Sequence, residues 1–255
     1  MLNLFRMDLY RMVKAKSFLI ILALSALLSL CSTPAKWALF QLARLIGGIG
    51  EDFGGTAQLS SILSNPYPFA FLPMIAASLF FYADLEFGYV KNIAGQVPKK
   101  GYTVLSKFCA SMVLSAAFAL TAIAFNLIGT LIFRSISASS EVGQSLLALL
   151  MKLILMQACL SIVLFFVAGL KNKSLGLVLS VLMGSGLMAL VYLGIDAGII
   201  RLFGLKSAFS ISNYMPDQLL GETYPDTLNA ILVSAAVTAI FLPLSIWIFD
   251  KKDVK

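Results

Sequence analysis

The sequence contains no histidine, and only 12% of its 255 residues are charged. The absence of histidine excludes Ser-His-Asp and Cys-His nucleophile systems, the H-E-x-x-H metalloprotease pattern and most zinc sites. A water-soluble domain carries about 25% charged residues, so about half of the usual charge is missing. This deficit excludes an ordinary soluble enzyme and, despite the net charge of +7, a nucleic-acid-binding module. We predict neither a catalytic residue nor a metal site.

Cysteine is also scarce, with Cys31, Cys109 and Cys159 far apart in the chain and each embedded in an apolar run. An odd number of widely spaced cysteines is not typical of a disulfide framework or a metal cluster. We expect all three to behave as small hydrophobic core residues.

What the chain has in abundance is apolar residues, at 60% of the sequence with a mean hydropathy of +0.93. A spanning helix needs about 20 predominantly apolar residues, within a range of about 17–25. We predict an all-α polytopic membrane protein, forming a single domain over residues 1–255 with six transmembrane helices. Only one charged residue, Lys152, lies within the predicted spans. The spans are residues 17–33, 66–83, 108–133, 146–170, 174–195 and 227–249.

The distribution of charge predicts that both termini are cytoplasmic. With that orientation, the inner side carries 13 of the 19 Lys and Arg residues but only five of the 12 acidic residues. This asymmetry satisfies the positive-inside rule for an even number of spans. The positive net charge therefore indicates topology rather than an acidic partner.

Three segments outside the spans have patterns of their own. Residues 1–16 carry apolar side chains at helical spacing, which favours an amphipathic helix on the cytoplasmic membrane surface or a basic leader that only fixes orientation. The connection 34–65 is expected to begin at Pro34 with an interfacial helix on the outer face. The segment 196–226 is too apolar for an ordinary outer loop, and it predicts a short re-entrant or surface helix.

Polar residues inside the spans are candidates for a substrate pathway. Asn126 and Gln157 are the strongest, although interhelical hydrogen bonding is the commoner use of such residues. The side chain of Lys152 could instead reach outward to water. The scarcity of intramembrane charge predicts an apolar pathway, and argues against an ion-coupled carrier or a membrane-embedded enzyme.

Proline and glycine positions add expectations about helix shape. Pro73 and Pro243 are expected to kink the second and sixth spans. Four glycines on or beside the fifth span are expected to let neighbouring helices approach this span closely, including at a subunit interface. They are Gly184, Gly186, Gly194 and Gly198.

The one substantial cytoplasmic connection is predicted over residues 84–107, between the second and third spans. It mixes acidic, aromatic and basic residues in a short segment with helical pattern, ended by Gly95 and Pro98. This composition suits a small helix that docks into a groove of a partner. It also suits a solvated connector whose lysines fix the topology, and the residues alone leave both interpretations open.

This connection resembles the loop that joins the second and third spans of ABC-2-type transporter permeases. The family pattern has an acid followed by Gly, Lys and an apolar residue, then a Pro-basic turn, an aromatic residue and another Lys. Lys99 stands where the family usually has Arg, which keeps the charge but loses planar bidentate pairing. The opening segment from Phe5 to Phe18 is similar to the amphipathic helix of that family. The matching loop residues are Glu86, Gly88, Lys91, Ile93, Pro98, Lys99, Tyr102 and Lys107.

The resemblance implies a permease subunit of an ABC exporter in a bacterial plasma membrane. Two permease subunits, expected to be identical, would pair around a pathway, and each would rest on a separate ATP-binding subunit that holds ATP and Mg²⁺. This chain would bind no cofactor, and its loop would contact the ATPase. The implied contact residues are Glu86, Phe87, Gly88, Tyr89, Lys91, Asn92 and Lys99, with Phe87 and Tyr89 as apolar anchors.

Small permeases of this kind resemble exporters of amphipathic peptides such as toxins, bacteriocins and cytolytic modulins, and we expect cargo of that class. Two alternatives stay open at this point. The chain could be a non-transporting membrane immunity or sensor protein, or an ABC permease for small hydrophobic drugs.

Overall fold

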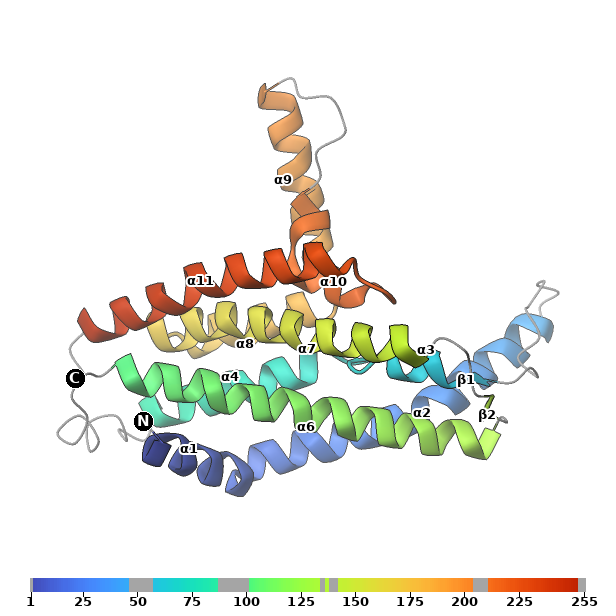
Figure 1. The fold of residues 1–255 in the computed structure, drawn as a ribbon. Coiled ribbons are helices and arrows are strands. Elements are labelled where there is room, and N and C mark those ends of the chain that lie inside the picture. The colour runs from blue at the N-terminus through green and yellow to red at the C-terminus, as the bar shows by residue number, and fades with distance from the viewer. Residues whose placement is uncertain are drawn as a thin grey trace.

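The computed structural model describes residues 2–45, 57–86, 101–133, 136–137, 142–203 and 211–251. Helices hold 89% of these residues, which confirms the predicted all-α class (Figure 1). In chain order the elements are α1 (Leu2–Lys14), α2 (Lys16–Leu45), β1 (Ala57–Gln58), α3 (Leu59–Leu63), α4 (Phe71–Glu86), α6 (Gly101–Phe133), β2 (Ile136–Ser137), α7 (Val142–Leu164), the π-helix η1 (Phe165–Gly169), α8 (Lys173–Gly184), α9 (Met188–Phe203), the 3₁₀-helix η2 (Ile211–Tyr214), α10 (Pro216–Gly221) and α11 (Thr227–Lys251).

Within the described residues, four helical segments are long and apolar enough to cross a membrane. A fifth span exists if α8 and α9, which are bent by 87° at a short break, are counted as one. The chain is a membrane protein, and its described residues do not confirm the predicted total of six spans. The four segments are Lys16–Lys36, Gly101–Phe133, Val142–Gly169 and Thr227–Lys251.

The second predicted span, 66–83, is shorter in the structure than in the sequence analysis. Helix α4 begins only at Phe71, because Pro66 and Pro68 restrict the backbone before it. Its 16 residues rise about 24 Å, less than the hydrocarbon thickness of about 30 Å. Pro73 lies in the first turn of α4, where its missing N–H breaks no helical hydrogen bond. Pro73 therefore interrupts no helical hydrogen bond, and the physical reason for expecting a kink at this proline does not apply.

The fifth predicted span, 174–195, is not a single straight helix. Helix α8 ends at Gly184, and Gly186 adopts a φ of +76°, a left-handed conformation that favours glycine. The chain then turns into α9, which projects away from the bundle in Figure 1. Most of α9 is exposed, and only Tyr192 and Asp196 of this helix are buried among its described side chains. The described part of the predicted outer segment 196–226 contains the C-terminal half of α9, the whole of η2 and the whole of α10.

Helix α2 continues through Pro34 instead of ending there, contrary to the sequence expectation. Pro34 has no N–H, so the carbonyl oxygen of Leu30 loses its normal helical donor. That oxygen lies against α6, only 2.6 Å from where a side chain at Gly129 would begin. The close approach of α2 and α6 therefore depends on glycine at this position.

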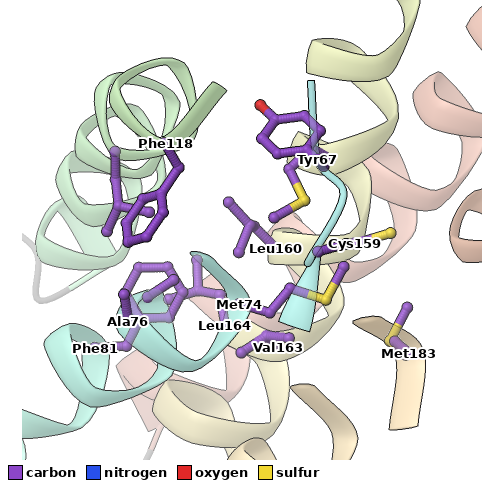
Figure 2. Close-up of a cluster of buried hydrophobic side chains, with 14 of the residues drawn as sticks. Tyr67, Met74, Ala76, Phe81, Phe118, Cys159, Leu160, Val163, Leu164 and Met183 are labelled. Carbon is purple, nitrogen blue, oxygen red and sulfur yellow. The ribbon is translucent and has the colours of Figure 1, made fainter. Parts of the chain in front are cut away.

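Helix α7 is the centre of the bundle. About two thirds of its spanning window is buried, compared with 11% for α11 and 22% for the span in α2. Met74 of α4, Phe118 of α6 and Leu160 of α7 meet in the apolar core shown in Figure 2. Cys159 also lies in this core, as predicted, whereas Cys31 and Cys109 are exposed and their prediction was wrong. A helix that faces lipid does not need to bury its apolar side chains in protein.

Candidate functional site

Charged side chains meet inside the bundle near the C-terminal end of α4. Asp84 accepts a hydrogen bond from the Arg11 guanidinium of α1. The Lys107 Nζ of α6 lies 2.7 Å from the second oxygen of the same carboxylate. Asp84 and Lys107 are each only 4% exposed. One buried carboxylate therefore joins three helices that are far apart in the sequence.

A second acid, Asp8, completes this network. Ser106 of α6 donates a hydrogen bond to the Asp8 carboxylate, and Arg11 Nη1 lies 3.9 Å from it. Lys107 also points toward the Phe80 ring, 4.5 Å from its centroid, and donates to the Phe80 carbonyl oxygen. The two carboxylates are paired with two basic groups, and this pairing offsets the energetic cost of burying charged groups. We call Asp8, Arg11, Asp84, Ser106 and Lys107 the charge network.

The network gives α1 a role that the sequence analysis did not assign. Asp8 is buried in the structure, as is Met12 one turn further along α1. Phe5 and Leu9 also pack against the protein core, whereas Tyr10 and Val13 are exposed. Residues Leu2–Lys14 form a helix of their own, and the apolar face of α1 packs partly on the bundle.

The pKa of Asp8 predicts how this network responds to pH. Burial raises the pKa of Asp8 above its usual 3.8, and this outweighs the opposite effects of Lys107 and Ser106. The folded state therefore binds this proton more tightly than the unfolded state, and the resulting stability is lost as pH rises through the raised pKa. We expect wild type to lose stability relative to Asp8→Asn as pH rises above about 4, as thermal unfolding in detergent would show. Parallel pH profiles for the two proteins would contradict this assignment.

Further contacts hold both ends of the connection between α4 and α6, where we predict contact with an ATPase. Glu86, at the end of α4, pairs with Lys173 of α8 at 3.4 Å. The backbone N–H of Gly101, at the start of α6, donates to the Asp250 carboxylate of α11 at 2.6 Å. Of the predicted contact residues, Glu86 is half-exposed, and the others lie outside the described residues. These are Phe87, Gly88, Tyr89, Lys91, Asn92 and Lys99.

The structure separates the two predicted pathway residues. Asn126 lies at the α2–α6 interface, where its side-chain oxygen accepts a hydrogen bond from Ser32 at 3.5 Å. Gln157 instead binds α6 near the other end of that helix, donating to the Phe108 carbonyl at 2.9 Å and to Ser111 Oγ at 2.8 Å. Both residues form interhelical hydrogen bonds, and they do not belong to one site.

Gln157 borders a groove between α6, α7 and α11 with a volume of about 500 Å³. The groove is mostly apolar, and Ser115, Ser234 and Thr238 add hydroxyl groups to its lining. The Gln157 side-chain oxygen is buried and accepts no hydrogen bond from the described residues, while its amide nitrogen donates two. An apolar groove with a few polar groups is the usual form of a small-molecule site. We call it the Gln157 groove.

Lys152 departs from its expected position. Its side chain is 1% exposed, so it does not extend outward to water in this structure. Across the part of the chain that is described, no three or more His, Cys, Asp or Glu residues are grouped in a way that could hold a metal ion.

A comparison with protein-family models found no match, and a comparison with curated proteins found none.

Proposed function

We propose that the chain is the transmembrane permease subunit of an ATP-driven ABC exporter. In this proposal a separate ATP-binding subunit docks on the connection between α4 and α6, and two identical permeases pair to form the pathway. The observation that carries the proposal is the anchoring of both ends of this connection. Asp84 and Glu86 precede it and contact α1, α6 and α8, and Gly101 follows it and contacts α11.

This anchoring supports coupling because a displacement of the connection would be transmitted to several helices at once. A partner can shift the permease between two states only if it binds one of them more tightly. The ATP-bound partner would therefore favour one position of the α4–α6 connection. The charge network would pass that preference to α1 and α6 as a rigid set of paired groups.

The Gln157 groove supports the apolar character of the proposed cargo. Its walls suit amphipathic peptides for two reasons. The apolar face of such a peptide can contact the apolar walls. The backbone N–H groups at the start of a peptide helix have no helical partner, so they can donate hydrogen bonds to polar groups of the groove. Its volume also falls in the range of drug-sized sites, about 300–1,000 Å³. Export of small hydrophobic drugs is therefore the second candidate function.

The proposal is tested by co-purification and by two loop variants. A tagged wild-type protein should retain a soluble ATPase, and Glu86→Lys or Gly88→Pro should express normally but uncouple transport from ATP turnover. Coupling free energies of about 1–3 kcal/mol correspond to effects of about 5–150-fold, so we expect at least about a fivefold loss of ATP-dependent transport in proteoliposomes.

The matched control is Lys14→Gln, which changes an exposed basic residue of α1 outside the charge network. It should transport as wild type does. Normal transport by both loop variants would contradict docking at this connection, and a purified protein that retains no ATPase would favour a non-transporting sensor or immunity role.

A further inference from the structure

A second cavity lies away from the charge network, beyond the opposite end of α4. It has a volume of about 250 Å³ and lies among the residues before α4, the end of α8 and the short helix α10. Polar and apolar groups share its walls. The lining residues that matter here are Asn65, Ala70, Met183, Ser185, Asp217 and Leu220.

Among the described residues that line this cavity, Asp217 is the one with a charged side chain, and it is only 4% exposed. Its Oδ1 accepts a hydrogen bond from the Tyr192 hydroxyl at 2.9 Å, and its Oδ2 accepts one from the Gln218 amide at 2.9 Å. Both donors are neutral. Among the described residues no Lys or Arg forms a salt bridge with Asp217, in contrast to Asp84 in the charge network.

A buried carboxylate without a counter-charge is costly, because desolvation favours its neutral form. Burial accordingly raises the pKa of Asp217, despite the hydrogen bonds from Gln218 and Tyr192 that act in the opposite direction. Cys159 of α7 lies close enough to interact electrostatically with Asp217, and its fully buried thiol offers no positive charge. A cation in the cavity would supply the missing charge.

We propose that this cavity binds an alkylammonium group, with the Asp217 carboxylate as its counter-charge. The remaining walls favour an organic cation over a bare metal ion. Ala70, Met183 and Leu220 offer apolar contact to an alkyl stem, and Asn65 and Ser185 offer oxygen acceptors near the charged head. A water molecule takes about 30 Å³ in the liquid, so the cavity has room for a short alkylamine. This inference does not depend on the transport proposal.

The test measures thermal unfolding of the purified full-length protein with n-butylammonium, with n-butanol as the neutral analogue and with Na⁺. Wild type should show a saturable rise in melting temperature with n-butylammonium alone. Asp217→Asn, which keeps the side-chain shape, should bind n-butylammonium at least about tenfold more weakly, because it removes the counter-charge. The matched control is Glu222→Gln, an exposed acid close in sequence, and it should bind as wild type does.

Gly221→Leu provides a second variant in case Asp217→Asn does not fold. Gly221 is an exposed residue at the cavity wall, and a Cβ atom added there would meet no atom within 4 Å. The position therefore tolerates a side chain, and leucine should narrow the cavity without disturbing the bundle. This variant should fold and lose the n-butylammonium response. An equal response to n-butanol, a response to Na⁺ instead of n-butylammonium, or no response at all would each overturn the proposal.

Discussion

Replacing Asp84 with alanine is expected to lower the free energy of unfolding by about 3–5 kcal/mol, the usual cost of removing one partner of a buried ion pair. The loss is large because Lys107 would keep its charge while buried, and Arg11 would lose its hydrogen bond to Asp84. Denaturant titration of the purified protein in mixed micelles would measure the change. Asp84→Leu combined with Lys107→Met should recover most of the loss, because it removes both charges.

The same helix provides the control. Glu86 lies two residues after Asp84 and also forms an ion pair, but both Glu86 and Lys173 are substantially exposed. Exposed pairs contribute about 0–1 kcal/mol, so Glu86→Ala should change stability by less than about 1 kcal/mol. Equal losses for Asp84→Ala and Glu86→Ala would show that the charge network is not a buried structural unit.

The second large effect is expected at Gly184, where α8 meets the start of α4. A side chain added there would begin only 2.2 Å from the Phe71 Cα atom, and the obstacle is backbone. The two helices would have to move apart, so Gly184→Ala should destabilise the protein by about 1–3 kcal/mol or more. The same denaturant titration would measure this loss.

Gly194→Ala is the matched control for Gly184→Ala. Gly194 lies on the exposed α9, where an added side chain meets no atom within 4 Å. Alanine is favoured over glycine in a helix by about 1 kcal/mol, so this variant should be neutral or slightly stabilised. A loss at Gly194 as large as that at Gly184 would mean that helix contact does not decide the result.

The sequence predicted the elements that depend on local pattern. Helices α6, α7 and α11 contain most of the predicted spans 108–133, 146–170 and 227–249, because a long apolar run satisfies its backbone only as a helix. The helical spacing of apolar residues over 1–16 likewise agrees with the helix α1. Local pattern was insufficient at Pro34 and at Gly186, where contact with other helices and a single left-handed residue decide the path.

The candidate site was predicted less completely than the fold. Gln157 was found because an amide is conspicuous in an apolar run, and it does border a groove. The charge network was missed because its members are far apart in the sequence. Asp8 and Ser106 are 98 residues apart, and Arg11 and Asp84 are 73 residues apart. One available signal was the helical spacing of Asp8 and Met12, which places an acid on the same face as an apolar residue.

The bend between α8 and α9 determines how wide the molecule is within a membrane. If the bundle axis follows the bilayer normal, the 16 residues of α9 extend sideways by about 24 Å, parallel to the lipid surface. A neighbouring copy that approaches from that side would meet this arm before reaching the bundle. Figure 1 shows α2 and α6 on the opposite flank, and none of the described helices projects sideways there, so that side offers less hindrance to lateral association.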